Sequence, residues 1–268
     1  MLVWRGDRSV MDNKEYTSPI GLTSQFRFCP NAFRVDMYKG CSFGCKYCFT
    51  ANSNAQGHQG FGEAKLKKIQ NLFYKAFETD TKNNLTIELL RHKTPLHCGG
   101  KSDPFQHREF TSKLTYGLIE LCNKYEYPIC FSTKTASLPN EYFDILNPQL
   151  HAFQISILGW SEQFVKLWET NTLSSQDRLD FVKLLRKLGF WCSIRIQPLI
   201  DIDEAKLLVK NASDIPSYIT VEHLKLPADN NKALFNLPNA DGDFVKSPYN
   251  MRNIEPLPAK KNRQYSKN

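Results

Sequence analysis

Hydrophobic positions along this chain repeat with a period that switches between two and about 3.6 residues several times over residues 33–225. Short apolar or alternating runs predict strands, and longer runs with apolar residues three and four apart predict amphipathic helices. The pattern predicts strands at 33–37, 95–100, 127–133, 151–158, 190–196 and 218–224. It predicts helices at 63–77, 110–125, 140–146, 160–168, 175–188 and 203–210, with a further turn or two at 85–92.

The regular alternation of strand and helix determines the expected fold class. Parallel neighbouring strands cannot be joined by a tight turn, so alternation of this kind implies a parallel sheet with helical crossovers. A closed eight-unit barrel typically needs about 250 residues, and the periodic region holds about 190. We therefore predict an α/β fold, a partial (β/α)6 TIM-like barrel, with functional groups at the carboxyl ends of its strands. An open doubly wound sheet satisfies the same pattern.

The periodic region is flanked by segments of different character. Residues 1–32 show no sustained period and are predicted to be an N-terminal extension, and residues 33–225 are predicted to be the core domain. Residues 226–268 are rich in proline, asparagine and lysine and are predicted to be a C-terminal extension without a core of its own. The chain is thus expected to hold one folded domain with two extensions.

Composition and charge limit the class of protein, the cellular compartment and the partners that we expect for this chain. The 268 residues are 41% hydrophobic and 23% charged, and no apolar run reaches the roughly 20 residues that cross a bilayer. The N-terminus lacks the apolar core of a secretion signal, so we expect a cytoplasmic, reduced protein with no membrane partner; its oligomeric state stays open. The formal net charge of +8 favours phosphate-bearing partners, including nucleic acid. The basic C-terminal tail is either a nucleic-acid contact or a solvated end.

Three cysteines at Cys41, Cys45 and Cys48 carry the clearest chemical signal. They are spaced four and then three positions apart, near Gly40 and Gly44, so one short loop can bring their thiolates to a single inorganic centre. Three thiolates on a cluster of four irons leave one iron open to a ligand that is not protein. Structural zinc would need a fourth ligand from elsewhere in the chain, and this alternative stays open.

The run Cys-x3-Cys-x-aromatic-Cys, with Tyr47 at its aromatic position, resembles the signature of the radical S-adenosylmethionine (SAM) superfamily. Further stretches resemble the spore photoproduct lyase-like branch of that superfamily. These are residues 101–106 with Glu109, 132–135, 154–157, Glu169 with 174–178, and 193–198. The resemblance covers about residues 33–225 and implies a [4Fe-4S] cluster, SAM, and an external reductant such as flavodoxin or ferredoxin. It implies reductive cleavage of SAM to a 5′-deoxyadenosyl radical that abstracts hydrogen from a substrate.

The resemblance also implies roles for individual side chains. Ser102 and Asp103 would accept hydrogen bonds from the SAM ammonium group, Lys134 would pair with its carboxylate, and Tyr47 would lie beside its adenine. Gly99 and Gly100 would let the backbone approach the ligand, whereas Phe43 and Phe49 would shield the cluster. Ser156 and Arg195 are implied as further polar contacts. Each residue also has a structural alternative: Lys134 and Arg195 as ion-pair partners inside the barrel, Ser102 and Asp103 as a turn, and the aromatics as core.

Two positions depart from the lyase pattern. Where the lyase carries a hydrogen-donating cysteine, this chain has Gly100, and its nearest thiol is Cys98; where the lyase has a tyrosine, this chain has Phe49. These differences argue against direct repair of thymine dimers. We therefore predict a radical SAM enzyme with an unidentified substrate, with Cys98 as a candidate hydrogen donor. The competing hypothesis is a non-catalytic nucleic-acid-binding module stabilised by a structural zinc.

Overall fold

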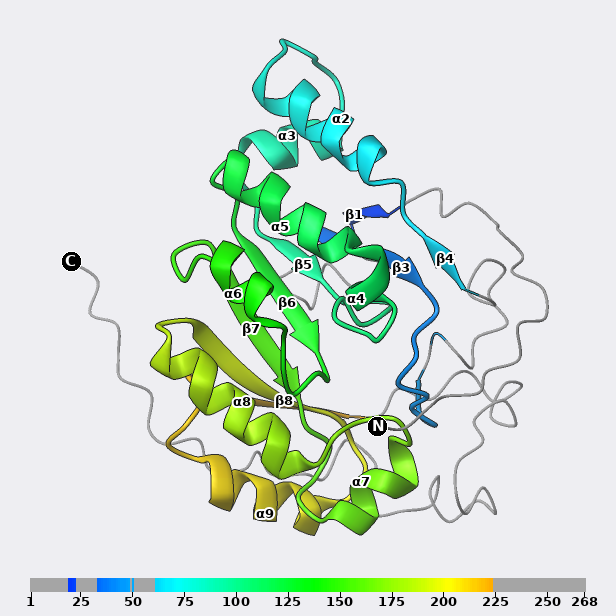
Figure 1. Cartoon of the computed structure of the whole chain (residues 1–268), viewed down its shortest axis with the longest axis vertical. Coiled ribbons are helices and arrows are strands. Elements are labelled where there is room, and N and C mark those ends of the chain that lie inside the picture. The colour runs from blue at the N-terminus through cyan, green and yellow to red at the C-terminus, as the bar shows by residue number, and fades with distance from the viewer. Residues whose placement is uncertain (1–18, 23–32, 49, 51–60, 224–268) are drawn as a thin grey trace.

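The computed structural model describes residues 19–22, 33–48, 50 and 61–223. Its centre is a seven-stranded sheet in the order β1-β2-β5-β6-β7-β8-β9, seen from its helix-covered side in Figure 1. The strands are β1 (Ile20–Leu22), β2 (Phe33–Val35), β5 (Leu96–Cys98), β6 (Ile129–Thr133), β7 (His151–Ser156), β8 (Trp191–Leu199) and β9 (Ile219–His223). A separate antiparallel pair joins β3 (Tyr38–Lys39) to β4 (Gly62–Glu63).

Strands β2, β5, β6, β7, β8 and β9 pair in parallel, each with the next. This arrangement confirms the predicted α/β fold with six parallel strands in a partial barrel, because sequential strands are neighbours and helices connect most of them. Strand β1 adds an antiparallel edge, with Ile20 opposite Val35. This edge strand comes from the predicted N-terminal extension and was not expected from the sequence.

Helices follow the predicted order with shifted ends. They are α2 (Leu66–Phe77), α3 (Leu85–Arg91), α4 (Glu109–Ser112), α5 (Leu114–Lys124), α6 (Asn140–Ile145), α7 (Glu162–Trp168), α8 (Ser175–Lys187) and α9 (Ile202–Ala212). The helix expected at 110–125 is two helices, because Lys113 adopts a left-handed conformation with φ 51°. The carboxylate of Glu109 accepts hydrogen bonds from the amides of Thr115 and Tyr116 and thereby caps the second helix.

Helix α8 has the ends that its sequence predicts. The hydroxyl of Ser174 accepts a hydrogen bond from the amide of Asp177, whose carboxylate accepts one from the amide of Ser174, so the two form a capping box. Gly189, just beyond the helix, has φ 89°, a conformation that glycine adopts without strain.

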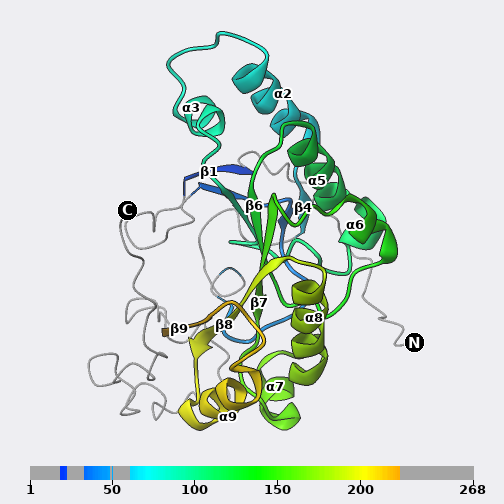
Figure 2. The ribbon, with the colours of Figure 1, turned by 90° about the vertical axis from the view of Figure 1, so that its left-hand side faces the viewer.

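The sheet has two chemically different faces. Helices α5, α6 and α8 lie on one side of it (Figure 2), where Phe131, Phe153 and Ile194 belong to the hydrophobic core. On each strand, the residues directly before and after a core residue point to the opposite face of the sheet, because side chains alternate along a strand. We call that opposite face, which carries His97, Ser132, Gln154 and Arg195, the inner face.

Within the described ranges, no helix is long and apolar enough to span a membrane. The predicted boundaries at residues 32 and 225 stay predictions, and the C-terminal extension lies outside the described residues, as does Phe49.

Candidate cofactor-binding site

The three cysteines lie on one loop at the carboxyl end of the parallel sheet, beyond β3. Gly40 and Gly44 turn this loop with φ values of 76° and 64°, which favour glycine. A side chain at Gly44 would also come within 3.0 Å of the hydroxyl of Thr170. Glycine at position 44 is therefore favoured for two reasons: the backbone conformation, and the close contact with the segment around Thr170.

Gln106 holds the first half of the cysteine loop. Its side chain is fully buried, its amide nitrogen donates to the carbonyl of Gly40 at 3.1 Å, and its amide oxygen accepts from the backbone of Ser42 at 3.0 Å. Both ends of one side chain thus fix the backbone on either side of Cys41. Gln106 belongs to the stretch 101–106 that the sequence singles out, but sequence reasoning gave it no role.

The segment after helix α7 holds the second half of the loop. The amide of Lys46 donates to the carbonyl of Trp168 at 2.9 Å, and Cys45 forms an antiparallel bridge with Glu169. The side chain of Asn171 donates to the carbonyl of Ser42 at 2.9 Å. The cysteine loop is therefore held between two segments that are more than fifty residues distant from it in the chain.

The thiols are half-buried and close enough to affect one another electrostatically. Burial raises the pKa of Cys41 to about 11 and that of Cys45 to about 12; nearby Lys134 lowers the latter, but by less than burial raises it. The Cys48 sulfur lies 3.0 Å from the hydroxyl of Thr50. Without a metal the thiols of Cys41 and Cys45 are protonated near neutral pH, and binding a metal releases those protons.

A donor set of three thiols on one loop fits an iron–sulfur cluster, which Cys thiolates hold. In the described part of the chain, no three His, Cys, Asp or Glu side chains converge closely enough to hold a single metal ion.

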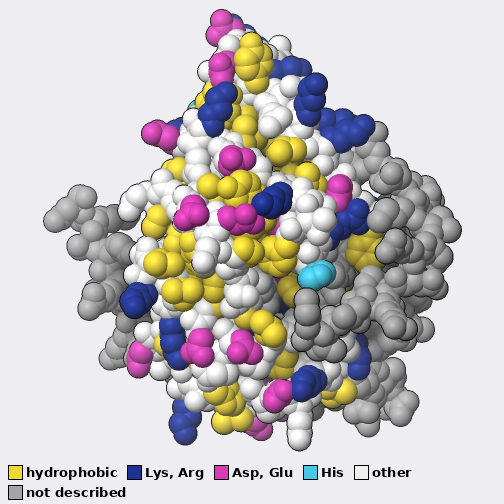
Figure 3. All heavy atoms as spheres, in the orientation of Figure 1, with side chains coloured by type: hydrophobic (Ala, Val, Ile, Leu, Met, Phe, Trp, Pro, Cys, Tyr) yellow, Lys and Arg dark blue, Asp and Glu magenta, His cyan; other side chains and the backbone are white. Residues whose placement is uncertain are grey.

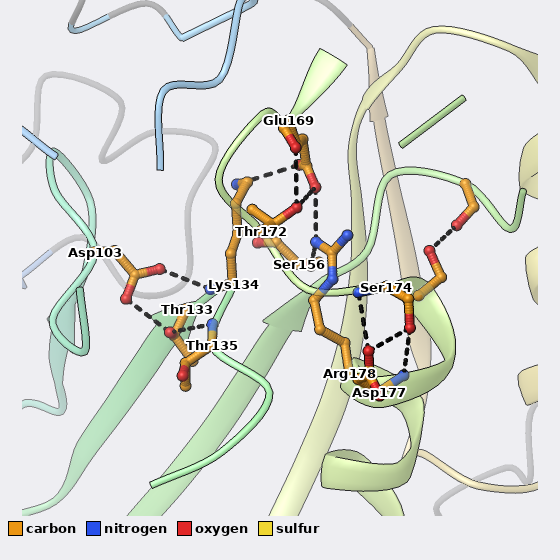
Figure 4. A network of polar contacts seen from close by, with 12 residues as sticks. Asp103, Thr133, Lys134, Thr135, Ser156, Glu169, Thr172, Ser174, Asp177 and Arg178 are labelled. Carbon is orange, nitrogen blue, oxygen red and sulfur yellow. Dashed lines mark hydrogen bonds and ion pairs between the residues drawn. The ribbon is translucent and has the colours of Figure 1, made fainter. Parts of the chain in front are cut away.

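A buried ionic network of Glu169, Arg178 and Lys134 lies beside the cysteine loop, and Figure 4 shows these three residues with their contacts. Tyr47, between the last two cysteines, donates its hydroxyl to the carboxylate of Glu169. Arg178, which is fully buried, donates to Glu169 at 2.7 Å and to the carbonyl of Ser156 at 2.8 Å. Burial would raise the pKa of Glu169, but the charges of Arg178 and Lys134 outweigh burial, so this carboxylate is ionised.

Lys134 extends from the end of β6 toward the same network, as Figure 4 shows. Its ammonium lies 3.9 Å from Glu169 and 5.6 Å from the centre of the Tyr47 ring. Its side chain is only 18% exposed, and the hydrogen bonds of the described residues give its ammonium no acceptor. Burial lowers the pKa of Lys134, but the neighbouring acidic groups Cys45, Glu169 and Asp103 outweigh burial and raise the pKa above its usual value, so this lysine is charged beside the ionised Glu169. A charged, largely buried ammonium without a hydrogen-bond acceptor can receive an anionic ligand.

The side chains of Ser102 and Asp103 make hydrogen bonds to other residues of the protein. The Ser102 hydroxyl donates to the carbonyl of Tyr38 at 2.7 Å. The Asp103 carboxylate accepts from the Thr133 hydroxyl at 2.7 Å and from the Lys134 amide at 2.6 Å. Asp103 therefore ties the loop after β5 to the end of β6 and fixes the backbone from which Lys134 extends. Contacts of Ser102 and Asp103 with SAM stay predictions, and the structural alternative has support.

Gly99 and Gly100 differ in how much space a side chain would have at each position. Gly99 has φ 109°, and a side chain there would overlap the carbonyl oxygen of Ser132 on the neighbouring strand, so packing alone requires glycine. A side chain at Gly100 would meet Asp36 no closer than 3.8 Å, which is an ordinary contact. The close approach of a ligand to these two backbones stays a prediction.

Cys98 is fully buried in the hydrophobic core. In register it lies beside Val35 and Phe131, which also belong to the core, whereas its neighbour His97 bonds to Ser132 on the inner face. The thiol therefore packs on the helix-covered face of β5. This placement favours a packing role, and hydrogen donation by Cys98 stays a prediction.

The remaining predicted contacts lie on the inner face or beside it. Ser156 and Arg195 are paired across β7 and β8. The backbone carbonyl of Ser156 accepts from Arg178, and a side-chain nitrogen of Arg195 donates to Gln154 at 3.3 Å. The structure thus places Tyr47 and Lys134 beside each other and near Cys45, with Ser156 joined to them through Arg178 and Glu169. Sequence reasoning gave no role to Glu169 or Arg178, although the stretches that contain them were noticed.

The helix-covered face of the molecule carries mixed charge. Figure 3 shows basic and acidic side chains interspersed over this face, with hydrophobic ones between them. The positive net charge is therefore not gathered on this side.

The chain folds as a partial α/β barrel of the radical SAM type, with a cysteine loop at the carboxyl ends of its strands. No protein-family model and no curated protein matches the chain. Among solved structures it is similar to a cysteine-to-serine variant of spore photoproduct lyase, with a TM-score of 0.60 and 16% identity over 82% of this chain and 63% of the lyase. The lyase in complex with dinucleoside spore photoproduct matches with a TM-score of 0.55 and 17% identity over 76% of this chain and 60% of the lyase.

Streptococcus suis SuiB bound to S-adenosylmethionine is also similar, with a TM-score of 0.52 and 12% identity over 73% of this chain and 41% of SuiB. The lyase and SuiB are both radical SAM enzymes, and the resemblance seen in the sequence is confirmed at the level of the fold. The chain spans less than two thirds of the length of either protein.

Proposed function

We propose that this protein is a radical SAM enzyme. Cys41, Cys45 and Cys48 would hold a [4Fe-4S] cluster, and SAM would bind beside it. The observation that carries the proposal is Lys134, a largely buried ammonium that faces Tyr47 and the cysteine loop and has no hydrogen-bond acceptor among the described residues. SAM has a carboxylate that matches this requirement. Structures with the same fold hold SAM, namely SuiB and a lyase variant.

A bound cluster, once reduced by an external donor such as flavodoxin or ferredoxin, would supply the one electron needed to cleave SAM to methionine and a 5′-deoxyadenosyl radical for hydrogen abstraction from the substrate. The protein's part is to bind and orient. Gln106 and the segment Trp168–Asn171 fix the loop that presents the three thiols. Lys134 would bind the SAM carboxylate, and Glu169, neutralised by Arg178, would keep Lys134 and Tyr47 in position.

The test is reconstitution with iron and sulfide without oxygen, followed by reduction with dithionite or flavodoxin in the presence of SAM. We expect about four irons per chain and formation of 5′-deoxyadenosine. Replacing Cys45 by alanine should abolish both, whereas the control Cys192→Ala, in the hydrophobic core, should keep both. A loaded cluster that yields no 5′-deoxyadenosine, or a protein that binds one zinc ion instead, would contradict the proposal.

Lys134 gives a second, independent test. Its replacement by methionine removes the charge but keeps most of the chain volume, so SAM affinity should fall about tenfold or more while the iron content stays unchanged. The exposed Lys124 on helix α5 is the matched control, and Lys124→Met should bind SAM normally. Equal SAM affinity in the two variants would remove Lys134 from the site.

We further propose that the substrate is a nucleic acid or nucleotide. The net charge of +8 favours phosphate-bearing ligands, and one structure with this fold holds a dinucleoside spore photoproduct. Gly100 and Phe49, which stand where the lyase has a cysteine and a tyrosine, argue against the repair reaction itself.

A further inference from the structure

The cysteine loop and the segment after α7 run side by side in opposite directions. Residues 43–46 pair with residues 168–171 through a bridge between Cys45 and Glu169 and through backbone hydrogen bonds of 2.9 and 3.3 Å on either side of it. In Figure 1 the cysteine loop belongs to the blue segment that runs from β3 down to α7. The paired segments therefore have one side toward the candidate site and one side away from it.

These two sides differ in burial. Glu169 is 1% exposed and lies 3.9 Å from the ammonium of Lys134 on the inside, whereas Thr170 and Gly44 are exposed. The hydroxyl of Thr170 donates to the carbonyl of Gly44 at 3.4 Å, so the two exposed residues are in contact. The charges of Lys134 and Glu169 both act on the thiol of Cys45, which places this thiol close to the inside. Only the thin layer of the paired segments thus lies between the Cys45 thiol and solvent.

The exposed side of the paired segments is uncharged and partly apolar. Gly44, Thr170 and Asn171 are exposed there, and the exposed leucines Leu167 and Leu173 flank Thr170 and Asn171 in the chain. Leu167 is 45% exposed and Leu173 is 54% exposed. We call these five residues the outer patch. A centre without charges that includes apolar side chains is typical of the central part of a protein–protein interface.

Positive charge borders the outer patch. Residues 39–48 contain two partly exposed lysines, Lys39 and Lys46, and no acidic residue. Lys166 on α7 is 69% exposed and pairs with Glu162 of the same helix at 2.5 Å, a kind of surface pair that is worth little. Together with the net charge of +8, this border attracts an acidic protein and repels a second copy of this chain.

The proposed function requires one electron from an external donor. Electron transfer slows steeply as the distance between two redox centres grows, so a protein donor must bind where the cysteine thiols are close to the surface. The inside of the cysteine loop faces Lys134, where SAM would bind. The outer patch is on the opposite side of the same thin layer and leaves the SAM position free.

We infer that the outer patch is the docking surface for an acidic protein that carries a one-electron redox centre, a flavin or an iron–sulfur cluster, close to its own surface. Leu167 and Leu173 would be buried against this partner, and the lysines around the patch would steer it. The inference rests on the proposed function, because that function requires the electron. It adds the place where the electron donor binds and the chemistry by which the donor is selected.

The test compares a small reductant with protein carriers on the cluster-loaded full chain with SAM under anaerobic conditions. Dithionite needs no docking surface, whereas flavodoxin and a [2Fe-2S] ferredoxin are acidic protein carriers. The rate of 5′-deoxyadenosine formation is measured against carrier concentration, and the affinity of each fluorescein-labelled carrier is measured by fluorescence anisotropy. For Leu173→Asp and Lys166→Glu we expect the affinity to fall about fivefold or more and the half-saturating carrier concentration to rise by a similar factor. The rate with dithionite should stay unchanged.

Matched controls repeat each change far from the outer patch. Leu85→Asp replaces a leucine that is 63% exposed at the start of α3. Lys124→Glu replaces a lysine that is 63% exposed and, like Lys166, pairs with a glutamate. Figure 1 shows α3 at the opposite end of the molecule from α7. Both controls should respond to the carriers as the unchanged protein does.

The inference is wrong if the patch variants and the controls bind the carriers alike, or if neither carrier binds the unchanged protein. It is also wrong if the patch variants lose the dithionite-driven rate as strongly as the carrier-driven rate, because these residues then act on the cluster and not on a partner. Failure of the proposed function is seen separately, as a loaded cluster that yields no 5′-deoxyadenosine with dithionite. The anisotropy measurement then still decides whether the outer patch binds an acidic carrier.

Discussion

Replacing Arg178 by methionine is the perturbation whose cost follows most directly from the structure. Arg178 and Glu169 are both fully buried and lie 2.7 Å apart. Methionine fills much of the arginine volume but leaves the Glu169 carboxylate in the interior without its main counter-charge. Removing one partner of a buried ion pair typically costs about 3–5 kcal/mol, because an uncompensated charge remains.

Two further contacts, one of Glu169 and one of Arg178, change the expected loss in the free energy of unfolding. Lys134 lies 3.9 Å from Glu169 and retains part of the compensation, which favours the lower end of the range. Arg178 also donates to the carbonyl of Ser156 at 2.8 Å, and its loss leaves that carbonyl without this donor. We therefore expect a loss of about 3 kcal/mol, which is a large part of the roughly 5–15 kcal/mol that folded proteins possess.

The assay is urea unfolding of the metal-free, reduced protein, which avoids the complication of a bound cofactor. The control is Arg186→Met, an exposed arginine near the end of the same helix, which should cost less than about 1 kcal/mol. The double variant Glu169→Gln with Arg178→Met removes both charges and should lose less than the sum of the single variants. A cost of Arg178→Met no greater than that of Arg186→Met, or purely additive effects, would refute the reasoning.

Three further predictions concern other parts of the fold. Gly99→Ala should destabilise the protein by more than about 2 kcal/mol, because φ is 109° and a side chain would overlap the Ser132 carbonyl; Gly21→Ala, with no atom within 4 Å, is the control in urea unfolding. The pKa of His97 in the folded protein is about 4, below its ordinary value of 6.5. As the pH falls, the unfolded chain therefore takes up a proton at a higher pH than the folded protein does, and the free energy of unfolding should decrease as the pH is lowered from 6.5 to about 4. An NMR titration of the His97 ring that shows a pKa near 6.5 would contradict this. Cys98→Ala should leave SAM cleavage intact, and product analysis then decides between hydrogen donation and packing: normal product formation would remove Cys98 from the mechanism.

Several features could be predicted from the sequence because they depend on residues close together in the chain. The periods of two and 3.6 residues indicate six strand–helix units, and the structure has six parallel strands in sequential order. The spacing of Cys41, Cys45 and Cys48 indicates one loop, since turns at Gly40 and Gly44 are local properties. The capping box at Ser174 is equally local.

Other features were decided only by the tertiary structure, because they depend on contacts between distant segments. Tyr47 and the carboxylate it contacts are 122 positions apart, and no local pattern indicates that Glu169 and Arg178 form a buried pair beneath the cysteine loop. Strand alternation shows that Cys98 and His97 point to opposite faces, but only the packing of helices on one side determines which face is the core. Side-chain alternation is a property of the strand, whereas the choice of face is a property of the whole sheet.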